Sequence, residues 1–174
     1  MERTKTCVDY FKVLNTVAFD PATREEEAFP LAFAITVHKD IAIVEMFLAL
    51  FFRPTDLYCI HVDSKASKDI LATVKSIVTC YEEMFPQSKI FLAQNPVPVF
   101  WGRGGTMMEA DMLCYRQLVK LSETWKMVAN IAGSELPFVS HQKFREVLKR
   151  SGGSILRIGP NNLPQRQKEH FQLR

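Results

Sequence analysis

The sequence predicts an α/β fold in which helices flank a mainly parallel sheet. From Phe29 onward, short apolar runs alternate with segments of helical periodicity, which is the order of elements that builds parallel sheets. The first two apolar runs are hydrophobic at almost every position, as is typical of strands buried on both faces. A chain of 174 residues with 47% hydrophobic positions is also long enough to bury the core of one domain.

The first strand is expected at 31–37, where the sequence LAFAITV is apolar at all positions but one. A helix is expected over 41–51, with Asp40 as its N-cap. Arg53-Pro54 should stop this helix, because a residue before proline avoids the helical conformation. The second strand is expected at 57–62, where LYCIHV follows.

Ser67 is expected to cap the next helix, whose apolar face is formed by Leu71, Val74, Ile77 and Val78. A short third strand is expected at 89–93, followed by a loop over 94–105 that is rich in proline and glycine. Thr106 is expected to cap a further helix, with apolar positions at Met107, Ala110, Leu113, Leu118 and Leu121.

A fourth strand is expected at 125–131, and a final helix at 141–149 after the loop GSELP. The residues after Ser151 are rich in glycine, proline and asparagine, and we expect them to be irregular. The alternation of strand and helix therefore continues to about residue 150.

Polar side chains stand where the first two strands are expected to end, with Thr36 and His38 after the first and Asp63 and Lys65 after the second. A buried strand has no use for an unpaired carboxylate, whose charge would be costly in the core. In open α/β sheets ligands bind beyond the carboxyl ends of the strands, so the two ends would face one crevice if the strands are neighbours. The alternative is that Asp63 is an ordinary helix-capping or surface aspartate.

Several functional classes lose support from motifs and charge. No GxGxxG follows the first strand and no GxxxxGK[ST] occurs, which argues against dinucleotide-dependent redox proteins and P-loop enzymes. The net charge is only +3 and the basic residues are spread along the chain, so no nucleic-acid partner is expected. No apolar stretch reaches 18 residues and residues 1–5 lack the apolar core of a secretory signal, so we expect no transmembrane segment in this chain.

Four cysteines lie far apart, at Cys7, Cys59, Cys80 and Cys114. No CxxC pair or Cys/His pair at zinc-binding spacing occurs, so a structural metal site is not expected. The residues alone leave two interpretations of this even number. The four side chains form two disulfides in an oxidising compartment, or they are buried thiols in a reducing one.

Four segments together resemble one known family. They are FPLAFAITVHKD, FFRPTDLYCIHVDSKAS, VFWGRGGTMMEADMLCYRQL and WKMVANIAGSELPFVS, which recur in this order with nearly matching spacing. The family is the core 2/I-branching β-1,6-N-acetylglucosaminyltransferases, grouped with the peptide O-xylosyltransferases as glycosyltransferase family 14. The resemblance extends from Cys7 to about Arg150. It implies a GT-A-like (Rossmann-like) domain, of which this chain would be the truncated amino-terminal half.

The resemblance implies that this half binds a UDP-sugar donor, with no divalent metal and no other cofactor. The family lacks the DxD motif of metal-using relatives, and HVD here offers one carboxylate, a poor site for Mg²⁺ or Mn²⁺. Asp63 is suited instead to accept hydrogen bonds from the nucleotide. The positions that match the family's nucleotide-sugar contacts are Thr36, Val37, His38, Asp63, Ser64, Lys65, Trp101 and Gly102. Lys65 could instead be solvated surface, and Trp101 a core aromatic.

The resemblance also pairs the cysteines, as Cys7–Cys80 and Cys59–Cys114. Each bridge would close a loop of about 50 to 70 residues and contribute roughly 4 kcal/mol in the chain-entropy model. Two disulfides agree with the Golgi lumen or membrane location that the family implies. The type II membrane anchor of the family would lie outside this chain.

The family transfers a sugar, usually GlcNAc, to an O-glycan of a glycoprotein acceptor in β-1,6 linkage, and inverts the anomeric carbon. A carboxylate deprotonates the attacking hydroxyl, and Arg and Lys side chains meet the charge of the leaving diphosphate. The resemblance places these groups beyond Arg174, so no catalytic residue is expected here and this chain alone would be inactive. The alternative function is a non-catalytic UDP-sugar-binding fragment or pseudoenzyme. Glu135 stands where relatives often carry an acidic residue near the acceptor side.

The expected organisation has three parts. An N-terminal flank that contains Cys7 covers 1–28, and the nucleotide-sugar-binding half covers 29–150. An irregular segment at 151–174 is expected where the acceptor half would begin.

Other residues have structural interpretations. His61 is expected to be structural and to point away from the crevice. Glu109 and Asp111 lie on an expected helix and should be solvated or ion-paired, while Met107 and Met108 are expected to pack in the core.

Overall fold

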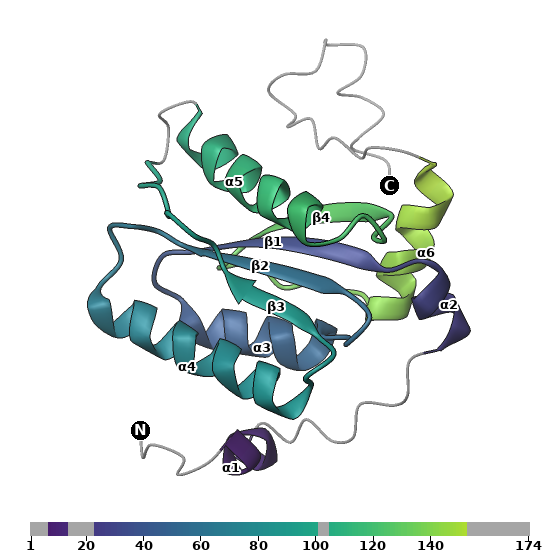
Figure 1. Cartoon of the computed structure of the whole chain (residues 1–174), viewed down its shortest axis with the longest axis horizontal. Coiled ribbons are helices and arrows are strands. Elements are labelled where there is room, and N and C mark those ends of the chain that lie inside the picture. The colour runs from purple at the N-terminus through teal and green to yellow at the C-terminus, as the bar shows by residue number, and fades with distance from the viewer. Residues whose placement is uncertain (1–6, 14–22, 101–104, 153–174) are drawn as a thin grey trace.

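The structure is a computed structural model that describes residues 7–13, 23–100 and 105–152. Within these residues one parallel sheet has the strand order β3-β2-β1-β4 (Figure 1). The strands are β1 (Leu31–Val37), β2 (Leu57–Val62), β3 (Lys89–Leu92) and β4 (Met127–Ala132). The predicted α/β fold is confirmed, and β1 and β2 are neighbours, as the crevice at their ends requires.

Helices lie on both sides of the sheet, with α5 over one face and α3 and α4 under the other (Figure 1). Phe144 of α6 packs against Phe33 and Phe51, so α6 contacts the same face as α3. No helix in the described ranges is both long and apolar enough to cross a bilayer. The helices are α1 (Cys7–Val13), α2 (Arg24–Ala28), α3 (Ile41–Phe51), α4 (Lys68–Met84), α5 (Thr106–Leu121) and α6 (His141–Ser151).

The two faces of the sheet carry side chains of different size, because residues alternate between faces along each strand. Large residues dominate on the α3 side, where Phe33 stacks on Tyr58 with ring centroids 5.2 Å apart. On the α5 side the central strand presents Ala32 and Ala34, which pack with Leu118. These small side chains let α5 approach the sheet and contact both β1 and β2.

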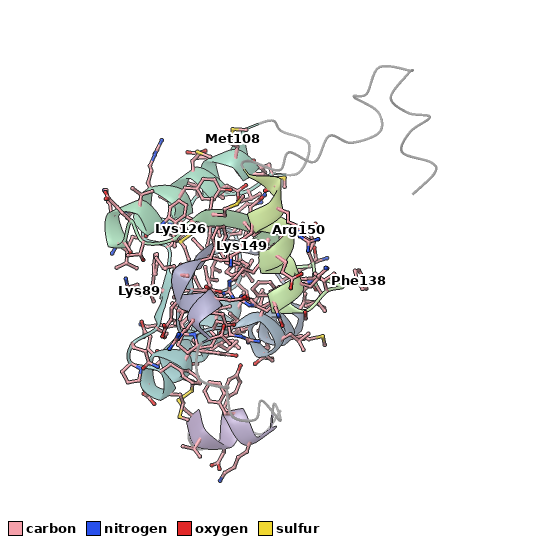
Figure 2. The ribbon with its side chains drawn as sticks, turned by 90° about the vertical axis from the view of Figure 1, so that its right-hand side faces the viewer. Lys89, Met108, Lys126, Phe138, Lys149 and Arg150 are labelled. Carbon is pink, nitrogen blue, oxygen red and sulfur yellow. A yellow bond between two sulfur atoms is a disulfide. The ribbon has the colours of Figure 1, made fainter. Side chains whose placement is uncertain are left out.

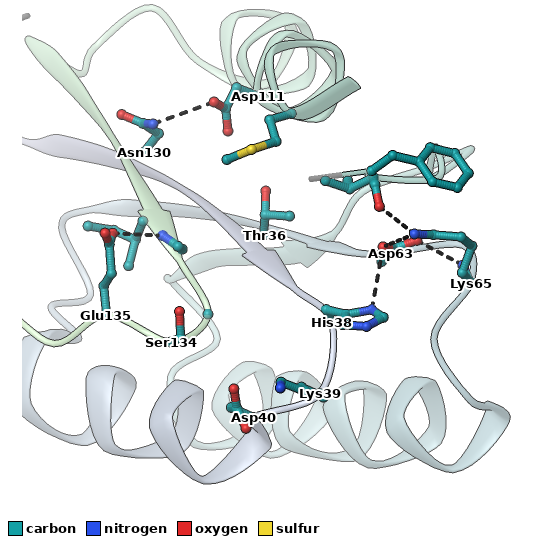
Figure 3. A pocket seen from close by; sticks show the side chains of 16 residues that line it. Thr36, His38, Lys39, Asp40, Asp63, Lys65, Asp111, Asn130, Ser134 and Glu135 are labelled. Carbon is teal, nitrogen blue, oxygen red and sulfur yellow. Dashed lines mark hydrogen bonds and ion pairs between the residues drawn. The ribbon is translucent and has the colours of Figure 1, made fainter. Parts of the chain in front are cut away.

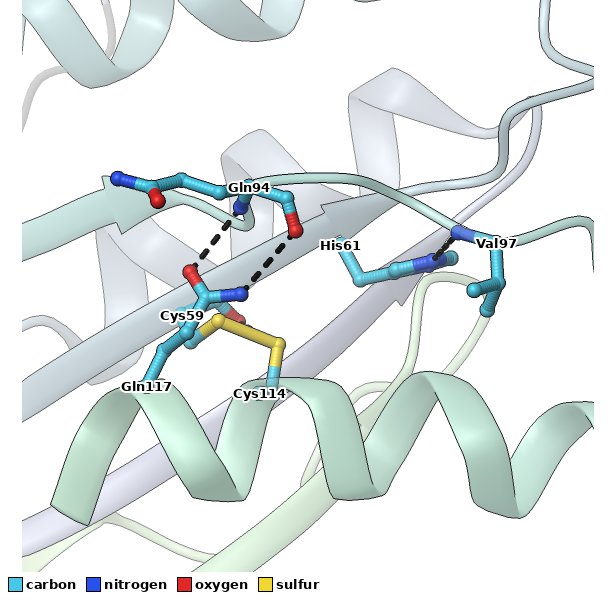
Figure 4. The surroundings of a disulfide bond; sticks show 6 residues. All are labelled: Cys59, His61, Gln94, Val97, Cys114 and Gln117. Atoms are coloured by element: carbon cyan, nitrogen blue, oxygen red, sulfur yellow. Dashed lines mark hydrogen bonds between the residues drawn. A yellow bond between two sulfur atoms is a disulfide. The ribbon is translucent and has the colours of Figure 1, made fainter. Parts of the chain in front are cut away.

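Both predicted disulfides are present. Cys7–Cys80 joins α1 to α4 with Cα atoms 5.0 Å apart, and Cys59–Cys114 joins β2 to α5 with Cα atoms 5.6 Å apart (Figure 4). No free cysteine occurs among the described residues. The second bridge fixes α5 over the strand that leads into Asp63.

We expect peptide mapping of the purified chain under non-reducing conditions to recover two bridged pairs, Cys7 with Cys80 and Cys59 with Cys114. Each pair has Cα atoms at a separation that suits a disulfide. Reduction should release all four peptides, which controls the assignment. Free thiols in protein made in an oxidising compartment, or a different pairing, would contradict this arrangement.

The helix starts agree only in part with the predicted caps. Ser67 caps α4 as expected, and its hydroxyl accepts a hydrogen bond from the Ile70 backbone at 3.3 Å. Asp40 is the N-cap residue of α3 as predicted, although its side chain makes no capping hydrogen bond. Thr106 is the first residue of α5 rather than its cap, because its hydroxyl is bonded to the backbone of Phe100 instead.

Some apolar residues that were expected in the core are exposed. Leu71 is 45% exposed and Leu121 is 48% exposed. Met107 and Met108 are 42% and 65% exposed, and Figure 2 shows Met108 at the surface. The two methionines lie off the buried side of α5, which is formed by Ala110, Cys114 and Leu118.

Element boundaries also shift slightly. β3 ends at Leu92, one residue early, and β4 begins at Met127, two residues later than expected. α6 extends to Ser151, where the left-handed Gly152 ends it.

A buried cluster of charged side chains lies at the amino ends of β1 and β2. Asp56 accepts hydrogen bonds from the Leu31 backbone at 2.9 Å and from Arg145 at 3.2 Å. The other oxygen of Asp56 lies 2.7 Å from His141 Nε2. Arg145 also lies 3.2 Å from Glu26, and all four of these charged or polar side chains are buried. The cluster therefore ties α2 and α6 to the end of the sheet that is opposite Asp63.

Candidate functional site

A cavity of about 590 Å³ lies at the carboxyl ends of the strands, where it is lined by residues of β1, β4, α5 and the loops after β1, β2 and β4 (Figure 3). β2 and β3 lie on one side of β1, whereas β4 lies on the other. The cavity is thus at the point where the strand order reverses, which is where open α/β sheets bind ligands.

Asp63 lies directly after β2 and is only 3% exposed. Its backbone N–H donates to the Val37 carbonyl at 2.8 Å, which holds the ends of β1 and β2 together. One oxygen of its carboxylate accepts from the Lys65 backbone at 2.9 Å. The other lies 3.4 Å from both the Lys65 ammonium and His38 Nδ1. A carboxylate occurs at this strand end because the polar groups around it compensate for its burial.

These contacts keep Asp63 ionised. Burial alone would raise the pKa of Asp63, but hydrogen bonds from the backbone of Lys65 and Val99 and from the Lys65 side chain outweigh it. The pKa therefore lies below its usual value. At neutral pH, Asp63 is a buried negative charge at the edge of the cavity, where it can accept hydrogen bonds from a ligand.

Lys65 is held in place at the cavity wall. Its ammonium donates to the Val99 carbonyl and lies 4.1 Å from the centroid of the Phe100 ring. Lys65 is nevertheless an exposed residue, so it is a solvated side chain that is also ion-paired with Asp63. The loop over 94–100 therefore reaches the cavity through backbone and ring contacts to this lysine.

The loop after β4 closes the other side of the cavity. The Gly133 backbone donates to the Thr36 carbonyl at 2.7 Å, and a Cβ at Gly133 would lie 2.8 Å from the same oxygen. Only glycine permits this close approach of the loop to the end of β1. The Glu135 carboxylate accepts from the Ala132 backbone at 3.1 Å, so Glu135 lines the cavity in a fixed position.

His61 is buried and does not line the cavity. Its Nε2 accepts a hydrogen bond from the Val97 backbone at 3.0 Å (Figure 4). Burial lowers the pKa of His61, so the ring is neutral and can act as this acceptor. His61 therefore positions the loop after β3, in agreement with its structural interpretation.

The predicted nucleotide-sugar contacts fall into three groups. Thr36, His38, Asp63 and Lys65 line the cavity. Val37 and Ser64 adjoin it through the backbone, because Val37 accepts from Asp63 and the Ser64 N–H donates to the Val97 carbonyl at 3.4 Å. Trp101 and Gly102 lie outside the described residues.

Asp111 and Asn130 also line the cavity, and sequence reasoning did not identify either. Asn130 Nδ2 donates to Asp111 Oδ2 at 3.4 Å (Figure 3). Burial raises the pKa of Asp111, and the bond from Asn130 only partly opposes that effect. Asp111 is half-buried, and its hydrogen bond to Asn130 lies where solvent reaches it. Glu109 is exposed as expected.

The described side chains do not include any group of three or more His, Cys, Asp or Glu residues that is arranged to hold a metal ion. The charged groups that line the cavity fall into two sets. His38 and Lys65 lie beside Asp63 and Lys39 is followed by Asp40 in the loop after β1, while Asp111 and Glu135 lie on α5 and in the loop after β4.

Comparisons with known proteins give one consistent result. The family model described as "Branch: Core-2/I-Branching enzyme" matches residues 31–170. The human "Beta-1,3-galactosyl-O-glycosyl-glycoprotein beta-1,6-N-acetylglucosaminyltransferase" is 30% identical over 98% of this chain and 38% of its own length. The protein of the same name from Bos taurus is 29% identical over 97% of the chain and 38% of its own length.

A second human relative carries a different name. The human "N-acetyllactosaminide beta-1,6-N-acetylglucosaminyl-transferase" is 32% identical over 91% of this chain and 37% of its own length. The chain thus spans less than two fifths of the length of these relatives.

Proposed function

The chain belongs to the Core-2/I-branching enzyme family, and we propose that it binds the UDP-sugar donor of an inverting, metal-independent glycosyltransferase. The sugar in this proposal is GlcNAc, which the names of the relatives contain, and the acceptor is an O-glycan of a glycoprotein, extended in β-1,6 linkage. Residues 29–150 form the donor-binding half.

The position of Asp63 carries this proposal. An ionised carboxylate at the carboxyl end of β2 borders a cavity that is large enough for part of a nucleotide-sugar. Its acceptor oxygens suit the N–H and O–H groups of uridine. Thr36 at the end of the neighbouring strand lines the same cavity.

Metal-independent binding is supported by two lysines, Lys39 and Lys65, that line the cavity. Their ammonium groups can offset the negative charge of a diphosphate without a divalent ion. In a metal-using site the Asp63 carboxylate would have further oxygen ligands beside it.

Two of the cavity carboxylates, Asp63 and Glu135, are not free to act as the general base. Asp63 is already paired with Lys65 and with His38, and Glu135 is bonded to the Ala132 backbone. A base must be within hydrogen-bond reach of the acceptor hydroxyl and free to take its proton. We therefore assign donor binding to this part of the protein and propose that other residues supply the base.

A Golgi location is part of the proposal, and the two disulfides support it. Disulfides form and persist in oxidising compartments, of which the secretory pathway is one. O-glycan acceptors on glycoproteins would be met in the same pathway.

We expect isothermal titration of the chain with UDP to show saturable binding that is the same in EDTA as in Mn²⁺. The reason is that Lys39 and Lys65, rather than a metal, face the diphosphate. ADP is the control, because a purine would not match the groups that Asp63 is proposed to recognise. Binding that appears only with added Mn²⁺ would contradict the metal-free account.

A further inference from the structure

We propose that Asp111 and Asn130 form a second recognition site in the cavity, which binds hydroxyl groups of the donor, either on its ribose or on its sugar. The inference rests on the proposed donor binding and extends it to the opposite wall of the cavity from Lys65.

The two side chains are brought together by elements that are rigidly held. Asn130 pairs in register with Ala34 of β1, so its side chain is on the face of the sheet that α5 covers. Asp111 is three residues before Cys114 on α5, which places both on neighbouring turns of the same side of the helix. The Cys59–Cys114 disulfide therefore holds the Asp111 carboxylate over the carboxyl end of the sheet.

The Asp111 carboxylate has bonding capacity that the hydrogen bond from Asn130 does not fill. An ionised carboxylate has about four lone-pair positions. The bond from Asn130 is 3.4 Å, longer than is usual for N–H···O bonds. Burial raises the pKa of Asp111, which indicates that the surroundings stabilise its charge poorly. A ligand that donates hydrogen bonds to the Asp111 carboxylate would stabilise its charge.

Among groups that donate hydrogen bonds, hydroxyl groups fit the Asp111 and Asn130 side of the cavity best. A phosphate would be repelled by the Asp111 carboxylate, whereas the ammonium groups of Lys39 and Lys65 elsewhere in the cavity attract it. An apolar group would leave the half-buried carboxylate without a partner, which is costly. The amide of Asn130 can accept as well as donate, so the pair matches a ligand with neighbouring hydroxyls. In a nucleotide-sugar, hydroxyls flank the diphosphate on both sides.

We expect Asp111→Asn to weaken binding of UDP-GlcNAc by about 10- to 100-fold, which is the loss of one hydrogen bond to a charged group. If the hydroxyls are on the sugar, the change weakens UDP-GlcNAc but not UDP. If they are on the ribose, it weakens UDP but not 2′,3′-dideoxy-UDP. Titration calorimetry of the wild-type and variant chains with these three ligands separates the two sources.

Glu109→Gln is the matched control, because it removes an exposed carboxylate from the same helix and should change none of the affinities. The alternative is that the Asp111–Asn130 bond only holds α5 against β4. In that case Asp111→Asn would weaken all three ligands by the same factor, or none, and either result overturns the inference. If the wild-type chain binds neither UDP nor UDP-GlcNAc, the proposed function itself fails and this inference with it.

Discussion

Asp63→Ala is expected to abolish measurable UDP binding, with an affinity loss of at least about 100-fold. The variant removes the buried negative charge at the end of β2 that is proposed to accept hydrogen bonds from uridine. Hydrogen bonds to a charged acceptor are worth about 1.5–3 kcal/mol each, and a carboxylate can accept two at once. Titration calorimetry with UDP measures the loss.

Two further variants show whether this loss is specific to the site. Asp69→Asn removes an exposed carboxylate from the first turn of α4 and should leave the affinity unchanged. Asp63→Asn retains an oxygen that can accept from the Lys65 backbone, as Asp63 Oδ1 does, so it should fold like the wild type. Asp63→Asn should bind UDP more weakly than the wild type, because the negative charge of the carboxylate is gone. A folded Asp63→Ala chain with wild-type affinity would contradict the proposed role of this residue.

Asp56→Ala is expected to lower the free energy of unfolding by about 3–5 kcal/mol, which is the cost of breaking a buried ion pair from one side. The variant removes one of the two carboxylate partners of the Arg145 guanidinium and leaves the Leu31 N–H without its acceptor. His141 loses its 2.7 Å contact as well. Urea denaturation, followed by circular dichroism, measures the change in the unfolding midpoint at constant slope.

Glu146→Gln is the matched control for that experiment. Glu146 forms an exposed pair with Lys143 at 3.2 Å on the same helix as Arg145, and exposed pairs of this kind contribute about 0.5 kcal/mol or less. Comparable losses for the two variants would mean that the buried cluster does not hold α6 to the sheet.

The strands and the polar ends of β1 and β2 could be predicted because the signals are local in the sequence. An apolar run such as LYCIHV identifies a buried strand by itself, and Asp63 follows it without a break. The predicted crevice depended on one further condition, that the two strands are neighbours in the sheet. The strand order meets this condition. The pairing of the cysteines came from the resemblance to a family, because spacing alone did not decide it.

The buried cluster and the Asp111–Asn130 pair could not be predicted because their partners are distant in sequence. Asp56 and Arg145 are 89 residues apart, and each alone looks like an ordinary surface charge. Asp111 and Asn130 are 19 residues apart on different elements. The one available signal was Asn130 itself, a polar side chain within the otherwise apolar strand MVANIA.

Helical spacing was a weaker guide to burial than strand patterning. Their apolar character predicts that Met107 and Met108 pack in the core, yet both lie in the first turn of α5, off its buried side, and are exposed. Met107 instead contributes to the cavity wall. Apolar side chains near a helix terminus therefore say little about burial when a ligand cavity adjoins that terminus.

A crystal structure of the chain with UDP tests the central claim most directly. We expect the nucleotide over the carboxyl ends of β1 and β2, with one of its N–H or O–H groups within hydrogen-bond distance of the Asp63 carboxylate and its phosphates toward Lys39 or Lys65. A nucleotide bound elsewhere on the molecule, with the Asp63 carboxylate bonded only to His38 and Lys65 as it is now, would contradict it.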